Sequence, residues 1–234
     1  MTFPLKAVQL GYSFSFGTPP LLRDLNFEVR PGEVLAIVGP SGSGKTTLCH
    51  CMSGIIPLIL GGTMTGDVQL HGVSTRKLTP ARIAQCLGIV FQNPETQLFF
   101  SEVADEIAFG PENLCVPPFI IEKRIDEALE KVGLPGFRDR NPHELSGGEK
   151  QRLALAAVLS LDPSILIFDE VTAHLDQDGT HRIRAIIKSL KQEGRTIVMV
   201  DHDPHQLEVA DRILLLKDGT LRNVLDHDEL VAIL

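Results

Sequence analysis

The segment VGPSGSGKTT, from Val38 to Thr47, decides the fold of this chain. It begins at the end of EVLAIVG, residues 33–39, a continuous apolar run typical of a buried parallel strand, and it precedes an apolar helical pattern. It matches the phosphate-loop pattern G-x-x-x-x-G-K-[ST]. Glycines let backbone N–H groups turn inward around phosphate oxygens, and the N-terminus of the following helix adds its dipole. The segment therefore predicts a nucleotide-binding loop between a strand and a helix.

The polar residues of this loop have expected roles. Lys45 would reach the β- and γ-phosphates, and the hydroxyl of Thr46 would bind Mg²⁺. We expect the nucleotide to contact the whole loop: Gly39, Pro40, Ser41, Gly42, Ser43, Gly44, Lys45, Thr46 and Thr47.

A second candidate site is a pair of carboxylates at the end of another apolar run, SILIFDE, residues 164–170. Adjacent carboxylates at the end of a buried strand are costly unless a cation or a reaction uses them. Because ligands of open α/β sheets bind at the C-terminal ends of strands, Asp169 would face Mg²⁺. Glu170 would polarise the attacking water as a general base. The alternative is that the pair only caps the helix that follows.

The pattern along the chain predicts one α/β domain with a helical insert. Strand patterns such as KAVQL and LNFEV come first. Helical periodicity dominates from about residue 102 to residue 161, as in IIEKRIDEALEKVGL. Strands then resume with SILIFDE, TIVMVDHD and the hairpin RILLLKDGTLRNV, which turns at Asp218-Gly219.

The composition limits the classes of function. The formal net charge is −8 and Trp is absent, whereas a dominant nucleic-acid surface usually needs a basic excess. The segment MTFPLKAVQL lacks the apolar region of a signal peptide, and the apolar stretch at residues 55–60 is far shorter than the ~20 residues of a membrane span. We therefore expect a soluble protein that contacts membranes only through a partner.

The four cysteines do not form a recognisable metal motif. Cys49 and Cys51 have C-x-C spacing, without a second pair nearby; Cys86 and Cys115 lie apart from them. We expect reduced thiols.

A third candidate site is HELSGGEKQRLALA, residues 143–156. Ser146-Gly147-Gly148 begins a helix, so its free N–H groups form an anion site, and the glycines let a phosphate approach the backbone. The charged run 149–152 is interpreted as the solvated face and first-turn dipole partner of the helix, without a chemical role.

LSGGEKQR resembles the signature sequence of ATP-binding cassette (ABC) ATPases. In that family, the signature of one subunit caps the γ-phosphate of ATP held by the phosphate loop of another, which implies that Ser146, Gly147, Gly148 and Glu149 serve a partner's nucleotide. The resemblance implies a P-loop NTPase (RecA-like) core with an antiparallel β subdomain and an inserted α-helical signature subdomain. The single domain would span 1–234, with the core at about 1–92 and 160–234 and the helical subdomain at about 93–159.

Other residues resemble family motifs in the same order. Gln92 resembles the Q-loop glutamine, which senses Mg²⁺ and water and links to the transmembrane partner. Asp176 resembles the D-loop aspartate, and His202 the switch histidine that contacts the γ-phosphate. Tyr12 resembles the aromatic residue that stacks on adenine, although Phe14 and Phe16 compete for that role. The resemblance thus implies Glu170, His202, Gln92 and Lys45 as catalytic residues and Thr46, Gln92 and Asp169 around Mg²⁺.

The D-loop departs from the family pattern. Where members usually read S-A-L-D, this chain has Ala173-His174-Leu175-Asp176. The departure puts the usual hydrogen bonding across the dimer in doubt and suggests asymmetric pairing.

FQNPETQLFFSEVADEIAFGPENL, residues 91–114, resembles energy-coupling factor (ECF) transporter ATPases, which serve vitamin and transition-metal uptake. This implies ATP and Mg²⁺ as cofactors and a place on the cytoplasmic face of the cell membrane. The implied partners are a second cassette, identical or paralogous, a transmembrane scaffold and a substrate-binding membrane subunit. In the ECF subgroup the segment after Gln92, including Gln97, packs against coupling helices. We expect the apolar residues of 93–110 to do so: Leu98, Phe99, Phe100, Ile107 and Phe109.

Two alternatives remain. One is a conventional ABC transporter ATPase. The other is a non-transport ABC ATPase that acts on nucleic acid or ribosomes, which the single cassette and the lack of sustained heptads disfavour.

Overall fold

The fold is built on a six-stranded, mostly parallel sheet. A computed structural model describes residues 2–201 and 203–224. The strand order is β10-β9-β3-β8-β7-β6, and only β10 runs antiparallel to its neighbour. The central strands β3, β7 and β8 are buried at every residue, as expected for a parallel sheet covered on both faces. The strands are β3 (Val34–Val38), β6 (Leu87–Val90), β7 (Ile165–Asp169), β8 (Thr196–Val200), β9 (Arg212–Lys217) and β10 (Thr220–Asn223).

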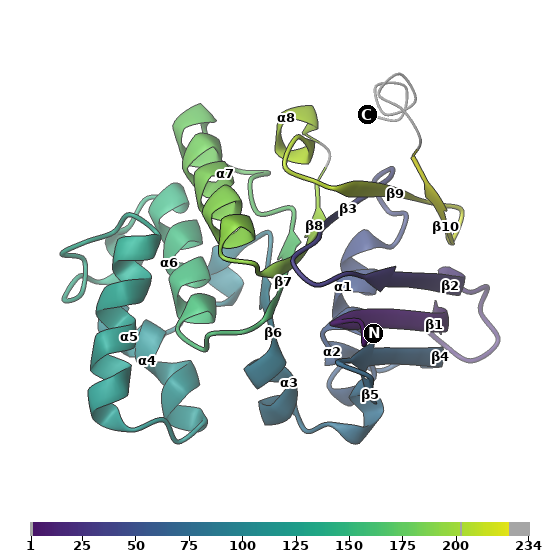
Figure 1. Cartoon of the computed structure of the whole chain (residues 1–234), viewed down its shortest axis with the longest axis horizontal. Helices are drawn as coiled ribbons and strands as arrows, with labels where there is room; N and C mark the ends of the chain where they lie inside the picture. Colours follow the sequence, from purple (N-terminus) through teal and green to yellow (C-terminus); the bar gives the residue numbers. More distant parts are fainter. Residues whose placement is uncertain (1, 202, 225–234) are drawn as a thin grey trace.

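A second, antiparallel sheet lies beside the first (Figure 1). Its order is β2-β1-β4-β5, with β1 (Leu5–Ser13), β2 (Leu22–Val29), β4 (Thr63–Leu70) and β5 (Val73–Ser74). Helix α1 (Lys45–Met52) contributes Leu48 and Met52 to an apolar cluster that joins the two sheets. The phosphate-loop helix is therefore fixed from both sides.

A helical insert lies between β6 and β7 in sequence and at one end of the molecule in Figure 1. Its main helices are α4 (Val103–Asn113), α5 (Pro118–Lys131) and α6 (Gly147–Leu159). They share one apolar core, to which α4 gives Ile107, α5 gives Ile125 and α6 gives Leu153. Leu166 and Phe168 of β7 belong to the same cluster, so the insert packs directly on the main sheet.

The remaining helical segments are short, except for α7 (Gln177–Gln192), which follows β7 and runs beside α6 in Figure 1. The short segments are α2 (Ile55–Leu58), η1 (Thr75–Lys77), α3 (Pro80–Cys86), η2 (Pro94–Thr96), η3 (Pro142–Glu144) and α8 (Pro204–Leu207).

The predicted fold class is confirmed: an α/β core, an antiparallel β subdomain and an inserted helical part are all present. The hairpin turn is also confirmed, because Asp218 and Gly219 both have positive φ between β9 and β10. Within the described ranges, no helix is long and apolar enough to cross a lipid bilayer.

Candidate functional site: a phosphate loop, a carboxylate strand and a glycine turn

The phosphate loop lies between β3 and α1, as predicted. A Cβ at Gly39 would lie 2.2 Å from the carbonyl oxygen of Leu216, so no side chain fits where the loop leaves the sheet. Gly44 has a φ of 101° at the N-cap of α1, a conformation that glycine adopts without strain. The loop is thus shaped by close backbone packing and left-handed turns.

Lys45 folds back over its own loop. Its Nζ donates to the carbonyl oxygens of Gly39 at 3.0 Å and Pro40 at 3.3 Å, and it lies 3.4 Å from Oε1 of Glu170. The ammonium group is nearly buried, and its contacts come from the two segments that the sequence assigned to phosphate and water. The structure therefore brings Lys45 and Glu170 into one site.

Thr46 and Asp169 meet at the same place. The Thr46 hydroxyl donates to Oδ1 of Asp169 at 3.3 Å. Burial raises the pKa of the Asp169 carboxyl from 3.8 to about 6, and the nearby carboxylate of Glu170 acts in the same direction. The hydrogen bond from Thr46 and the charge of Lys45 oppose this rise. A hydroxyl and a buried carboxylate form a donor set that suits a hard cation such as Mg²⁺.

The loop also has the features of a phosphate cradle. The Oγ of Ser43 is buried and, in the described part of the chain, has no hydrogen-bond partner. An unsatisfied buried hydroxyl is costly, and a phosphate oxygen would satisfy it. The residues present therefore fit a nucleotide with its Mg²⁺.

Glu170 has an unusual backbone conformation. Its φ is 48°, and its N–H donates to the carbonyl oxygen of Val200 at 2.9 Å, which ties it to the end of β8. A non-glycine residue with positive φ is uncommon, and such strain is typical of functional sites. The side chain of this residue lies 3.4 Å from Nζ of Lys45.

A pair of hydrogen bonds that was not among the expectations from sequence braces the turn after Glu170. Oδ2 of the buried Asp201 accepts a hydrogen bond from the Thr172 hydroxyl at 3.1 Å, and its Oδ1 accepts one from the N–H of Asp203 at 2.9 Å. The carboxylate thus fixes the turn after Glu170 to the segment after β8. An Asp directly after the apolar run TIVMV was the available signal. The neighbouring His202 lies outside the described residues.

The assignment of Tyr12 to adenine stacking is contradicted. Tyr12 is only 4% exposed, and its hydroxyl donates to the carbonyl oxygen of Gly61 at 3.0 Å. A ring in the core cannot receive a base. Phe14 is 65% exposed and Phe16 is 96% exposed, so the chain presents these two rings instead.

The signature turn begins α6 with a capping box. The Ser146 hydroxyl donates to Oε2 of Glu149 at 2.7 Å, and the Ser146 N–H donates to the same oxygen at 2.9 Å. These bonds lower the pKa of Glu149. Among residues 2–201 and 203–224, no atom lies within 4 Å of a Cβ placed at Gly147, so their packing does not require glycine there. The open space suits a ligand that approaches the backbone from outside.

A cavity of about 650 Å³ lies over this turn. Asp176 shares it with the signature residues, and its Oδ1 caps α7 by accepting from the N–H of Gly179 at 2.8 Å. Gln92 instead lines a smaller neighbouring cavity of about 190 Å³ with Gly147 and His174. Among the described residues, no hydrogen bond joins Gln92 to Thr46 or Asp169, so its role at Mg²⁺ stays a prediction.

The interpretation of residues 149–152 as a solvated face is wrong for its last three members. Lys150 pairs with Glu95 at 2.8 Å. Gln151 is 1% exposed and donates to the carbonyl oxygen of Phe91 at 3.0 Å. Arg152 is buried and donates to the carbonyl oxygens of Val132 and Gly133, at the end of α5.

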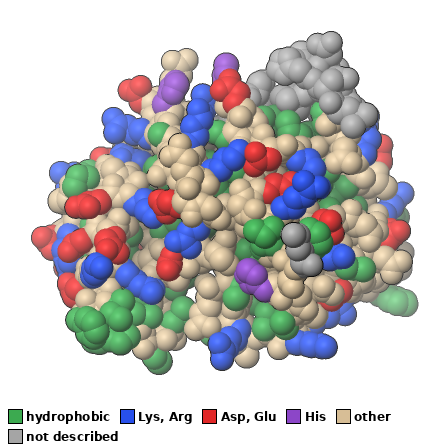
Figure 2. All heavy atoms as spheres, viewed as in Figure 1, with side chains coloured by type: hydrophobic (Ala, Val, Ile, Leu, Met, Phe, Trp, Pro, Cys, Tyr) green, Lys and Arg blue, Asp and Glu red, His purple; other side chains and the backbone are tan. Residues whose placement is uncertain are grey.

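The apolar segment after Gln92 divides into core and surface. Ile107 is fully buried and Leu98 packs against the core, so neither fits the predicted docking role. The rings of Phe99, Phe100 and Phe109 form a cluster with centroids 4.7 to 5.3 Å apart. Figure 2 shows hydrophobic side chains gathered near the ends of α4 and α5.

Internal hydrogen bonds hold this segment in place. Oε2 of the buried Glu106 accepts from the N–H groups of Phe99 and Phe100 at 2.9 and 2.8 Å. The Gln97 amide accepts from the N–H of Phe91 and donates to the carbonyl oxygen of Ile89, so this side chain binds β6 instead of facing outward.

No metal centre accompanies Cys49 and Cys51. Both thiols are buried and free, and burial raises the pKa of Cys51 to about 12. In the part of the chain that the structure covers, no group of three or more His, Cys, Asp or Glu residues could hold a metal ion.

The phosphate loop beside a buried carboxylate defines a nucleotide hydrolase of the phosphate-loop class. Comparison with known proteins narrows this class, because the family model described as ABC transporter matches residues 22–173. The chain belongs to this family and is an ABC ATPase.

Three similar proteins support this assignment. The energy-coupling factor transporter ATP-binding protein EcfA of Methanosarcina acetivorans is 40% identical over 228 residues, 94% of this chain and 81% of the relative. The structure of cbiO1 from Clostridium perfringens, part of the ABC transporter complex cbiONQ, has a TM-score of 0.82 and 32% identity, covering 99% of this chain and 91% of that chain. The cassette MJ0796, as a post-hydrolysis dimer bound to ADP and Pi, has a TM-score of 0.81 and 26% identity, covering 95% of this chain and 100% of that chain. The resemblance to ABC ATPases, with ECF-type ATPases among the relatives, is confirmed.

Proposed function

We propose that this ATPase powers an energy-coupling factor importer for a vitamin or a transition-metal ion. The observation that carries the proposal is the similarity to EcfA over 94% of the chain, together with that to cbiO1 over 99%. The transporter would supply the specificity for its substrate through the membrane subunits. The cassette would supply ATP binding and hydrolysis at the cytoplasmic face of the membrane.

The proposed mechanism uses two cassettes that close head to tail around two ATP molecules. One chain gives the phosphate loop with Lys45, and its partner gives the signature turn at Gly147. The open space over Gly147 supports this arrangement, because no residue in the described part of the chain occupies it. MJ0796, solved as a dimer, is a precedent for such pairing.

Within each site, we assign roles from the contacts described above. Thr46 and Asp169 would hold Mg²⁺, which would neutralise charge on the phosphates. Glu170 would accept a proton from the attacking water, while Lys45 would leave its loop carbonyls to bind the β- and γ-phosphates. Gln92 would contact Mg²⁺ and water, Asp176 would lie at the dimer contact, and His202 would contact the γ-phosphate.

The base would stack on an exposed aromatic ring near the end of β1. Phe14 is the better candidate, because it contacts the buried Tyr12 edge to face at 5.3 Å and is fixed by it. A ring that is both exposed and held in place loses little entropy when a base stacks on it.

The membrane partners would dock on the aromatic cluster of Phe99, Phe100 and Phe109. Exposed apolar patches mark interaction sites, and this one is held by the two hydrogen bonds to Glu106. A transmembrane scaffold and a substrate-binding membrane subunit are the partners that an ECF importer would supply.

Co-purification tests the proposal. The chain would be isolated from detergent-solubilised membranes, its co-purifying subunits identified, and ATP-dependent uptake measured for vitamins and transition-metal ions in vesicles. We expect a second cassette and membrane subunits, with uptake of one such substrate. Recovery of ribosomes or nucleic acid without membrane subunits would contradict the proposal.

A further inference from the structure

The backbone of Phe91, directly before Gln92, is held by the signature helix. Nε2 of Gln151 on α6 donates to the carbonyl oxygen of Phe91 at 3.0 Å. Gln151 is almost fully buried, so this hydrogen bond is shielded from water. A buried carbonyl oxygen that loses such a donor remains unsatisfied, which is costly.

The ring of Phe91 contacts the phosphate-loop helix. His50 on α1 lies edge to face on it, with ring centroids 5.8 Å apart. Burial lowers the pKa of His50, so this contact involves mainly the neutral imidazole at neutral pH. Phe91 therefore touches the nucleotide-binding helix through its ring and the signature helix through its backbone.

A second link joins the same two segments. Nζ of Lys150 lies 2.8 Å from Oε1 of Glu95, which belongs to η2 just beyond Gln92. Gln92 is thus flanked on both sides by residues that α6 holds. The segment that contains Gln92 and Glu95 lines one cavity together with Gly147, so Gln92 and the signature turn are neighbours.

We propose that Gln151 and the Lys150–Glu95 pair are positioning residues that make Gln92 and the signature turn move together. The inference rests on the proposed head-to-tail dimer, in which Gln92 serves the chain's own ATP and Gly147 serves the partner's ATP. These contacts then connect the two nucleotide sites within one chain. They also give Lys150 and Gln151, just beyond the glycine turn, a role in positioning the segment around Gln92.

The Lys150–Glu95 ion pair can be tested with variants that keep the protein folded. Partly exposed ion pairs contribute little to stability, so reversing one charge perturbs folding only slightly. Lys150→Glu and Glu95→Lys would each place like charges together and separate η2 from α6. The double variant Lys150→Glu with Glu95→Lys restores the pair with opposite polarity.

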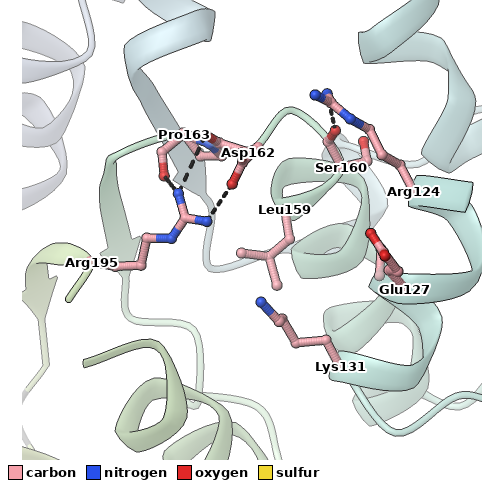
Figure 3. A pocket seen from close by; sticks show the side chains of 9 residues that line it. Arg124, Glu127, Lys131, Leu159, Ser160, Asp162, Pro163 and Arg195 are labelled. Atoms are coloured by element: carbon pink, nitrogen blue, oxygen red, sulfur yellow. Dashed lines mark hydrogen bonds and ion pairs between the residues drawn. The ribbon is translucent and has the colours of Figure 1, made fainter. Parts of the chain in front are cut away.

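A second ion pair between the insert and the core provides the control. Nζ of Lys131 on α5 lies 2.7 Å from Oε2 of Glu193, just after α7. Figure 3 shows Lys131 beside a pocket on another part of the insert, with Arg195 bound to Asp162 and to the carbonyl oxygen of Pro163. Lys131→Glu and Glu193→Lys make the same charge changes without touching the segment around Gln92.

Two quantities would be measured for each variant: MgADP affinity of the isolated full-length chain, and ATP turnover of the complete transporter. We expect Lys150→Glu and Glu95→Lys each to lower turnover about fivefold, and the double variant to restore it to within about twofold. MgADP affinity should stay within about twofold, because the phosphate loop is untouched. The control pair should change neither quantity.

Gln151→Met provides an independent test, because it keeps the side-chain length but removes the donor. We expect turnover to fall about tenfold with unchanged MgADP affinity. If it fails to fold, as judged by its melting curve, the charge reversal alone decides. Wild-type turnover in both single charge variants, absence of rescue in the double variant, or equal losses in the control pair would overturn the inference. Failure of the proposed nucleotide site would appear separately, as normal MgADP affinity in Lys45→Ala.

Discussion

Nζ of Lys45 lies 3.4 Å from Oε1 of Glu170, although Lys45 follows β3 and Glu170 follows β7, and β8 lies between these two strands. Glu170 has a φ of 48° directly after β7, and its N–H donates to the carbonyl oxygen of Val200 at 2.9 Å, so its backbone is fixed at the end of the sheet. The ammonium group thus lies between the carbonyl oxygens of its own loop and the candidate general base. A phosphate that attracts Lys45 would release Glu170 to contact water.

Glu170→Gln should lower ATP turnover by about two to four orders of magnitude, because the amide cannot accept the proton of the attacking water. MgATP binding should persist, since the phosphate loop is intact. Steady-state turnover and equilibrium titration would measure the two effects. Glu127→Gln, on the exposed face of α5, is the control and should leave both unchanged. Near wild-type turnover in Glu170→Gln would place the base elsewhere.

Asp169→Asn should stabilise the nucleotide-free chain at pH 7.5 but weaken its Mg²⁺-dependent ATP binding. Burial raises the pKa of Asp169 from 3.8 to about 6, so the native state binds more protons than the unfolded state between these values. The free energy of unfolding therefore falls as the pH rises through this window, by about 3 kcal/mol for this one group. Asp169→Asn has no carboxyl group that ionises at this position, so its free energy of unfolding does not show this fall.

Melting temperatures of both proteins between pH 4 and pH 8 would check this expectation. The stability gain of Asp169→Asn should grow from pH 4 to pH 6.5 and then level off. A gain that is the same at every pH would show that Asp169 does not titrate in this range. Asp139→Asn, at an exposed residue of the helical insert, controls for the loss of one negative charge.

Phe14→Ala should weaken MgATP binding about tenfold, because base stacking on an aromatic ring contributes on the order of 1–3 kcal/mol. Tyr12→Phe should leave the affinity unchanged, since it removes only the hydrogen bond to Gly61. Phe16→Ala is the comparison, because this ring is also exposed. Loss of affinity in Phe16→Ala alone would move the stacking role to Phe16.

The sequence predicted those parts of the site that consist of residues adjacent in the chain. The phosphate loop and the Asp169-Glu170 pair are local patterns at strand ends, so topology alone brings them together. Tyr12 could not be separated from Phe14 in this way. Its burial depends on Gly62, where a Cβ would lie 2.5 Å from the Tyr12 hydroxyl, and this contact crosses about fifty residues of chain.

Residues 149–152 also form contacts that the local sequence pattern could not predict. Its spacing is that of an ordinary charged helix face. The partners of Lys150 and Gln151, Glu95 and Phe91, depend on how α6 packs beside β6 and η2. The partner of Arg152, at the end of α5, depends on how α5 packs on α6 within the insert. No local pattern marks a glutamine that binds a distant backbone carbonyl.

Phe109→Glu should release the ATPase from its membrane complex, because it places a charge in the aromatic cluster that we propose as the docking surface. MgATP binding by the isolated chain should not change. Val73→Glu is a matched control, since Val73 is about as exposed but lies on β5 of the other sheet. Retained co-purification of Phe109→Glu would argue against docking at this cluster.

Gly147→Asp tests whether the signature turn serves the nucleotide of a partner cassette. The aspartate would place a side chain and a negative charge where phosphate must approach backbone N–H groups, in space that is open in this chain. The isolated monomer should still bind MgATP, because its phosphate loop is untouched, but dimer closure should fail. Lys45→Ala should instead abolish tight MgATP binding in the monomer.

In a mixture of the two variants, a mixed dimer has one site with neither lysine nor intact signature and one site with both. One closed site per mixed dimer should therefore appear, although neither homodimer has any. Stoichiometry of trapped ATP in tagged mixed dimers would measure this. Loss of ATP binding by Gly147→Asp monomers, or mixed dimers that form but trap no ATP, would refute the arrangement in trans. If Ala173 and His174 make the chain pair with a different cassette, Lys45→Ala is replaced by the corresponding change in that cassette, and the same single closed site is expected.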